Sequence, residues 1–211
     1  NIDLAETKVR AGDSLKLESQ SLNTTGITSL SSEKDNIYLK TVGNTALGNG
    51  IEVIAQKNVN ITAQGNIDIG TGQIKSNANN LNVTANNITS NVTSSAVNTN
   101  LAATQALKIQ QLASASSINN ANLTANTIDM NGKSYAKESN LIAGQDIVIG
   151  SQGIVSSSIT SQVKANNITI KGQLLGSNVD ANAMNNLQTD VGAIVFADNV
   201  ANLNAKNASL N

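Results

Sequence analysis

The feature that most constrains the fold is an apolar pattern that returns about every twenty residues. Leu15, Ile37, Val59 and Leu81 follow one another at equal intervals along the chain. Self-similarity sustained at such a period is the signature of a solenoid, and it outweighs local secondary-structure propensity. The sequence therefore predicts a stack of similar coils, each of which supplies the same few inward side chains.

The ladder continues beyond Leu81 with looser spacing. Leu101 extends it after a slightly shorter step, Leu123 follows at the original interval, and a second ladder begins with Ile67 and Ile88. All members are aliphatic, as a continuous core requires. The predicted core ladder consists of Leu15, Ile37, Val59, Ile61, Ile67, Leu81, Ile88, Leu123, Ile147 and Ile168.

A short phrase connects the ladder positions: two segments of alternating apolar residues on either side of a polar corner. Leu141–Ile149 is its clearest copy, and the phrase returns at 9–17, 53–61, 61–69 and 163–170. Alternation with period two indicates a strand with one buried face. Gly, Asn and Asp in the corner tolerate tight bends. The phrase therefore predicts strands joined by corners.

These strands predict an all-β fold, a parallel, right-handed β-helix solenoid. A solenoid of leucine-rich repeats needs a helical half in every repeat, and most repeats here offer only strands and corners. Residues 1–211 would form one β-helix of roughly ten coils of about 19–22 residues, about 50 Å long at the usual strand spacing. The asparagine pairs 79–80, 86–87 and 166–167 predict amide ladders between coils.

Two stretches interrupt the regular pattern. Residues 96–118 contain helix formers without Gly or Pro, so they form a short helix, a protruding loop or an irregular but ordinary coil. The step from Leu101 to Leu123 favours the ordinary coil. Residues 176–190 form a looser, polar turn.

Composition excludes several classes of function. The chain has no histidine and no cysteine, which excludes Ser-His and Cys-His catalysis and ordinary zinc sites. Its only arginine is Arg10 and only 1% of its residues are aromatic, so we expect no nucleic-acid partner. No apolar run is long enough to span a membrane. We expect no cofactor.

Carboxylates are the remaining candidates for chemistry. Asp3 with Glu6, Glu33 with Asp35, and Asp198 alone could support paired acid catalysis, but solvated corner residues explain them better. Further aspartates recur at corners without the Gly-Gly-x-Gly-x-Asp nonapeptide of calcium-binding β-rolls. We therefore predict no catalytic, cofactor-binding or metal-binding residue. These corner aspartates are Asp13, Asp68, Asp129 and Asp146.

Asn-x-Thr triplets are frequent and have two interpretations. They could be glycosylation acceptors on a secreted surface. They also arise automatically when a corner Asn is followed by an inward apolar residue and an outward Thr. The second interpretation is favoured. The triplets begin at Asn60, Asn82, Asn87, Asn91, Asn122 and Asn167.

The repeated phrase resembles the repeats of filamentous haemagglutinin-like exoproteins, best at 9–17 and 141–149, where Ala-Gly and an adjacent Asp form the corner. These adhesins and contact-dependent growth-inhibition effectors are exported by two-partner secretion in Gram-negative bacteria. The resemblance implies a secreted virulence-type rod outside the outer membrane, with an outer-membrane transporter as its partner during export. A similar rhythm occurs in autotransporter passengers and phage spikes.

We therefore expect a structural stalk and not an enzyme: a segment that extends from the cell and presents or delivers an effector or adhesive domain. An adhesin module that binds a receptor or glycan is the alternative, through a face or through residues 96–118. A β-helical carbohydrate-active enzyme is a remote third. The chain opens on Asn1 without Met or a signal peptide, so we expect a segment of a longer protein.

Overall fold

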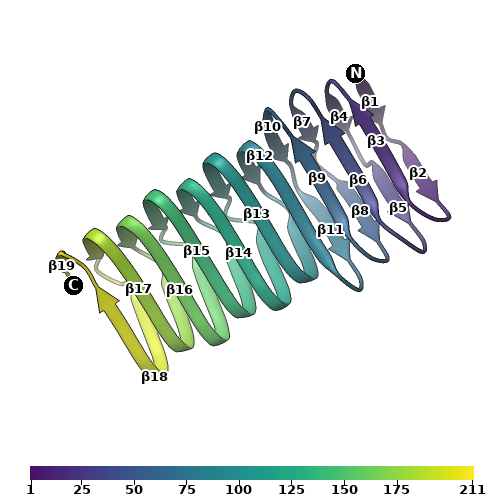
Figure 1. The fold of residues 1–211 in the computed structure, drawn as a ribbon. Coiled ribbons are helices and arrows are strands. Elements are labelled where there is room, and N and C mark those ends of the chain that lie inside the picture. Colours follow the sequence, from purple (N-terminus) through teal and green to yellow (C-terminus); the bar gives the residue numbers. More distant parts are fainter.

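The computed structural model describes residues 1–211 as one continuous stack of coils (Figure 1). It contains nineteen strands and no helix, and every strand pairing is parallel. The prediction of an all-β parallel solenoid of about ten coils is confirmed. Having no helix, the chain has none that could cross a membrane. The two termini lie at opposite ends of the stack (Figure 1).

Strands are short near the N-terminus and longer towards the C-terminus, where each one bends around corners without a break. They are β1 (Ile2–Ala5), β2 (Lys8–Ala11), β3 (Leu15–Ser19), β4 (Leu22–Thr25), β5 (Ser29–Ser32), β6 (Ile37–Thr41), β7 (Thr45–Leu47), β8 (Ile51–Ala55), β9 (Val59–Ala63), β10 (Asn66–Ile69), β11 (Gly72–Ser76), β12 (Asn80–Ser90), β13 (Thr93–Ile109), β14 (Ser114–Met130), β15 (Lys133–Ile149), β16 (Ile154–Ile170), β17 (Gln173–Thr189), β18 (Ile194–Asn204) and β19 (Asn207–Ser209).

Each coil presents three sheet faces, which we call A, B and C. Face A contains β1, β4, β7 and β10; face B contains β2, β5, β8 and β11; face C contains β3, β6 and β9. A long strand supplies all three: in β13, residues 93–96 lie on face B, 98–103 on face C and 106–109 on face A. The corners between them are the BC, CA and AB corners.

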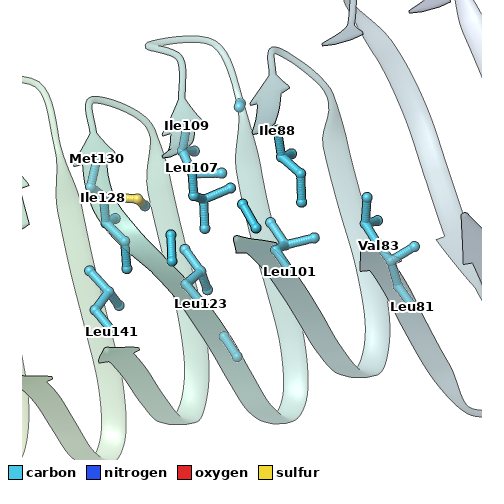
Figure 2. Packing of buried hydrophobic residues seen from close by; sticks show 14 of the residues in the cluster. Leu81, Val83, Ile88, Leu101, Leu107, Ile109, Leu123, Ile128, Met130 and Leu141 are labelled. Atoms are coloured by element: carbon cyan, nitrogen blue, oxygen red, sulfur yellow. The ribbon is translucent and has the colours of Figure 1, made fainter. Parts of the chain in front are cut away.

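The core fills the space between the three faces. One cluster of 45 buried hydrophobic residues runs through the stack, and side chains alternate between this core and the outside (Figure 2). On face A, Ile67 pairs with Ile88 and Ile147 pairs with Ile168, as their spacing predicts. The following ladder residues are all buried: Leu15, Ile37, Val59, Ile61, Ile67, Leu81, Ile88, Leu123, Ile147 and Ile168.

One predicted step of the ladder is wrong. Leu81 pairs with Thr99, while Leu101 pairs with Val83 and then with Leu123. The step from β12 to β13 on face C is therefore two residues shorter than the step from Leu81 to Leu101. A shift of two residues keeps every side chain on the same side of a strand. The apolar pattern therefore looks the same in both registers.

The two irregular stretches are strands in the structure. Residues 96–118 lie mostly in β13 and β14, which are joined by a turn at residues 111–112, and they form an ordinary coil. Ala96, Leu101 and Ala103 face the core at the spacing of a strand, so no helix or protruding loop replaces it. Residues 176–190 fall almost entirely within β17, which pairs with β16 and β18.

The coils alternate in length from β13 onward. The AB corner has four residues in one coil (110–113) and two in the next (131–132), while the BC corner has one (97) and then two (118–119). The structural repeat of this half is therefore a pair of coils, 40 residues long. Its equivalent face B positions are Thr93, Lys133 and Gln173 in one set, and Ser114, Ile154 and Ile194 in the other.

Close packing of unlike AB corners accounts for this alternation. In the longer corner, the Ala113 amide donates to the Gln110 carbonyl, which makes a turn that projects towards the next coil. The shorter corner rests on this turn, and a Cβ at Gly132 would collide with the carbonyl oxygens of both Gln110 and Ala113. A side chain at this position therefore has no room on the backbone of the shorter corner.

Asparagine side chains form ladders parallel to the stack, as predicted. On face C, the Nδ2 atom of each member donates to Oδ1 of the preceding member over 2.8–2.9 Å. Of the predicted pairs, Asn80, Asn87, Asn166 and Asn167 take part in amide–amide bonds. Asn86 accepts from the Thr104 hydroxyl instead. The face C ladder is Asn60, Asn82, Asn100, Asn122 and Asn140.

Asn100→Ala should lower the free energy of unfolding by about 1–2 kcal/mol, because it removes two amide bonds in the middle of this ladder. Urea denaturation followed by circular dichroism measures the change. Asn202→Ala is the control, since Asn202 lies on the same face without a side-chain hydrogen bond. Equal midpoints for the two variants would show that the ladder adds no stability.

Candidate functional site

The carboxylates considered for acid chemistry have different partners or none. Glu33 pairs with the Arg10 guanidinium, and Asp35 pairs with Lys57 across 3.3 Å. Asp198 accepts a hydrogen bond from Ser177, and Asp3 lies exposed on β1 close to the corner residue Glu6. The structure brings together no group of three or more metal-ligating His, Cys, Asp or Glu residues.

The four aspartates predicted at corners lie on different coils, and the prediction is wrong for three of them: only Asp13 lies in a corner, whereas Asp68, Asp129 and Asp146 lie within β10, β14 and β15. Asp129 accepts from the Asn131 amide, and Asp146 accepts from the Asn167 amide on the next coil. The Asp13 backbone carbonyl accepts from the Ser32 hydroxyl. Their polar contacts are therefore with neighbouring Asn and Ser residues of the solenoid itself.

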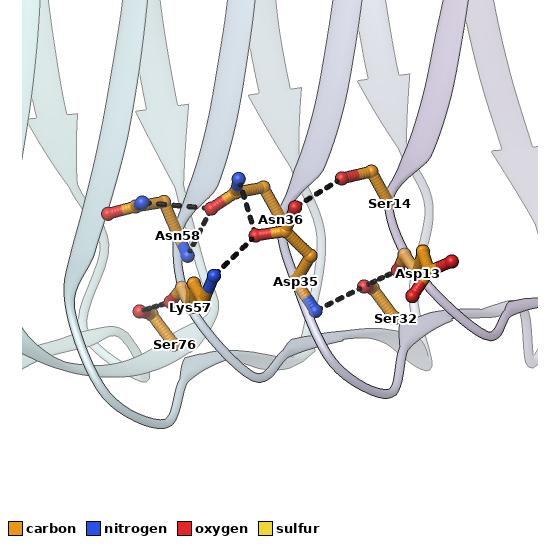
Figure 3. A network of polar contacts seen from close by, with 8 residues as sticks. All are labelled: Asp13, Ser14, Ser32, Asp35, Asn36, Lys57, Asn58 and Ser76. Carbon is orange, nitrogen blue, oxygen red and sulfur yellow. Dashed lines mark hydrogen bonds and ion pairs between the residues drawn. The ribbon is translucent and has the colours of Figure 1, made fainter.

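Asp35 is the centre of a polar network at the BC corner (Figure 3). The Ser14 hydroxyl donates to Asp35 Oδ2 over 2.9 Å from the preceding coil, and Lys57 Nζ lies 3.3 Å from Oδ1 on the following coil. The Ser14 hydrogen bond, and after it the Lys57 hydrogen bond, hold the pKa of Asp35 below its usual value, against a small opposing effect of desolvation. The ionised carboxylate thus ties three coils together.

This lowered pKa predicts a pH dependence of stability. A carboxyl group whose pKa is lower in the folded state stabilises the fold above its unfolded pKa of about 4, and this stabilisation is lost as the pH falls through the folded pKa. Urea midpoints measured from pH 7 to pH 3 should therefore fall less steeply for Asp35→Asn than for the native chain. Identical slopes for the two proteins would contradict a stabilising role for Asp35.

A hollow of about 450 Å³ lies outside the BC corner of β13–β16. There the one-residue corner at Lys137 lies between two two-residue corners, 118–119 and 158–159. A second hollow of about 220 Å³ adjoins it across Lys137, with Glu138 and Ile159 in its lining. The larger hollow is lined by Ser95, Ala96, Ser116, Ser117, Ile118, Tyr135, Ala136, Lys137 and Ser158.

The lining combines carbon-rich walls with one unpaired charge. Ile118 is 62% exposed and Tyr135 is 39% exposed, so both present apolar surface at the hollow. The structure contains four salt bridges, and Lys137 takes part in none of them. The Ser117 hydroxyl is buried at the base and has no hydrogen-bond partner.

The next copy of this corner, two coils further along, has polar side-chain contacts within the solenoid. The residue equivalent to Lys137 is Ser177, whose hydroxyl donates to the Ser158 carbonyl over 2.9 Å and to Asp198 Oδ2 over 3.4 Å. Ser177 therefore contacts a carboxylate of the next coil, whereas Lys137 has no ion pair, and its neighbour Glu138 lines the adjoining hollow.

Sequence reasoning did not find this hollow, although residues 96–118 do supply part of its lining. The signal in the sequence that could have indicated the hollow is the alternation of corner lengths. This alternation is recognised only when pairs of coils, which repeat every 40 residues, are aligned with one another. Three of the Asn-x-Thr triplets begin at asparagines that form amide bonds between coils. Asn60 and Asn82 lie in the face C ladder, and Asn87 donates to Asn66 on face A; each is followed by a buried apolar residue.

Comparison of the chain with protein-family models, with curated proteins and with solved structures finds no match.

Proposed function

We propose that the chain is a rigid stalk segment that extends, and thereby presents or delivers, an effector or adhesive domain. The observation that carries this proposal is the uninterrupted pairing of every coil with the next. Of 157 backbone hydrogen bonds, 121 lie within the strand ladders, and a single core of 45 residues passes through the stack. Bending or stretching such a rod would break ladder bonds and expose core at the same place.

Physical chemistry explains why a solenoid suits this task. A single coil cannot bury enough apolar surface to offset the cost of ordering its backbone, about 1–2 kcal/mol per residue. Stacked coils share their core and complete one another's hydrogen bonds, so stability accumulates with their number. Each added coil lengthens the rod by about 4.8 Å.

The proposed setting is the exterior of a Gram-negative outer membrane, reached through an outer-membrane transporter by two-partner secretion. The phrase at 9–17 and 141–149, similar to filamentous haemagglutinin repeats, supports this setting. A stack held together by aliphatic packing and amide ladders also needs no disulfide. An adhesin or a contact-dependent growth-inhibition effector would place such a segment between its anchor and its active end.

Distance measurement tests the stalk directly. The chain has no cysteine, so Asp13→Cys and Asn199→Cys allow two spin labels at BC corners that lie nine coil steps apart. Double electron–electron resonance should give one narrow distribution of the distance between the two labels, centred at about 43 Å. A broad distribution, or one centred far below this length, would overturn the stalk.

A surface-display experiment tests the role of the stalk. The chain is placed between an outer-membrane anchor and a terminal epitope, and antibody binding to intact cells is measured. The native chain should expose the epitope beyond the polysaccharide layer, and a variant with a broken core should not, at equal amounts on the cell. Equal antibody binding would show that extension does not depend on the fold.

A second candidate function is a binding module, and the hollow at Lys137 favours it. Exposed Ile118 and Tyr135 form an apolar surface at a recess, the kind of place where partners dock. Binding of the labelled chain to target cells should then be reduced by Ile118→Ser, although the rod remains intact. Unchanged binding would exclude the hollow as the contact.

A further inference from the structure

We propose that the hollow at Lys137 binds an extended acidic segment of a partner protein, with a carboxylate on Lys137 and an apolar side chain against Ala136 and Tyr135. This inference rests on the binding function proposed above and not on the stalk. It concerns the chemical class of the partner, which the fold alone leaves open.

The internal repeat gives the first argument for an acidic partner. At the equivalent corner two coils away, the chain itself supplies a carboxylate, Asp198, which accepts from Ser177 on the floor of the recess. At the hollow, the floor carries the Lys137 ammonium, while the walls carry Ile118 and Ser158 and no acid. The larger hollow therefore presents a cation and no acid in its lining, while Glu138 lines the adjoining hollow and forms no ion pair with Lys137.

A line of outward side chains on β15 gives the second argument. Lys133 and Tyr135 lie on the outer side of face B, and Lys137 follows at the corner, each two residues from the next. Neither lysine has an ion pair. Alternate side chains of an extended peptide have the same spacing, about 6.6–6.8 Å. A segment of the form acid, any residue, apolar residue, any residue, acid matches this line.

The nature of the walls favours a peptide over a saccharide. Ala96, Ala136, Ile118 and the ring of Tyr135 present mostly carbon, and the Ser117 hydroxyl is buried beneath them. Saccharides need many polar partners to replace the water on their hydroxyl groups. An aliphatic side chain needs none and gains from the burial of apolar surface.

Peptide selection tests the inference. A phage library of random heptapeptides is selected on the 211-residue chain, and the enriched peptides are synthesised with a fluorescent label. We expect enriched sequences with Asp or Glu on either side of an apolar residue, and fluorescence anisotropy should show affinity at least about tenfold weaker for Lys137→Glu. Tyr135→Ala should also weaken binding.

Two matched substitutions serve as controls. Tyr38 is as exposed as Tyr135, at 39%, but lies on face C of β6, and Lys75 lies outward on face B of β11 without an ion pair. Tyr38→Ala and Lys75→Glu should bind the selected peptides as the native chain does. Circular dichroism checks that all variants keep the fold.

The contrary outcomes are distinct. If the library yields no binding clone, both the binding function and this inference are overturned, and the stalk is unaffected. If clones bind Lys137→Glu as tightly as the native chain, the acidic partner is overturned while the binding function remains. If oligogalacturonate, tested in parallel, binds in a Lys137-dependent way and peptides do not, the ligand is an anionic saccharide and the inference is overturned.

Discussion

Ile61→Asp should unfold the solenoid around β9, whereas the same aspartate one residue later, in Thr62→Asp, should leave it intact. Ile61 is fully buried between Leu39 and Val83 of the adjacent coils. A carboxylate there would have neither water nor a partner, and an uncompensated buried charge costs about 3–5 kcal/mol. Thr62 faces outward beside Lys40, so its replacement meets solvent and a cation.

Thermal melts followed by circular dichroism distinguish the two variants. The expected loss is a large part of the stability of an ordinary domain, about 5–15 kcal/mol. Because coils stabilise one another, disruption at β9 should spread to adjacent coils before distant ones. Ile147→Asp repeats the experiment in the C-terminal half. A melting temperature unchanged by Ile61→Asp, or lowered equally by Thr62→Asp, would contradict the assignment of inward and outward faces.

Deletion of residues 114–153 should give a folded solenoid two coils shorter, whereas deletion of residues 114–132 should not fold stably. The first deletion removes one 40-residue pair and places β13 next to β16, which has the register and corner lengths of β14. The second places β13 next to β15, so the four-residue AB corner at 150–153 would stack on the one at 110–113. At that place the native chain has Gly132, where even a Cβ would collide with carbonyl oxygens.

The measurement compares both deletions with the native chain. Small-angle scattering should show the rod of the 40-residue deletion shortened by about 10 Å with an unchanged cross-section. Its melting should remain cooperative. The 19-residue deletion, although smaller, should lose several kcal/mol or aggregate, since its two corners cannot pack closely. If the smaller deletion proved the more stable, the pair of coils would not be the structural unit.

The N-terminal half could be predicted almost residue by residue because its coils have nearly constant length. Leu15, Ile37, Val59 and Leu81 pair directly, as their equal steps predict. The prediction became wrong at Leu101, where coil length changes by an even number of residues and the inward pattern survives the shift. The nine-residue phrase had a similar limit: the copy at 9–17 spans a BC corner and the copy at 141–149 a CA corner.

The candidate site was harder to predict than the fold. Ile118, Lys137 and Ser158 lie far apart in sequence and meet only because successive coils stack with unequal corners. No local motif marks such a recess, since each corner taken alone is an ordinary polar turn. The unpaired state of Lys137 is also a property of its neighbours on other coils, which a single stretch of sequence does not specify.

The sequence by itself determined which side chains face inward, and therefore that the chain coils around an aliphatic axis. Period-two alternation is a local property, because each residue's side is set by the strand geometry of its immediate neighbours. Only the tertiary structure decided which residues stack on one another and where the surface is recessed. Those depend on corner lengths and on packing between coils, and registers that differ by two residues bury the same apolar pattern equally well.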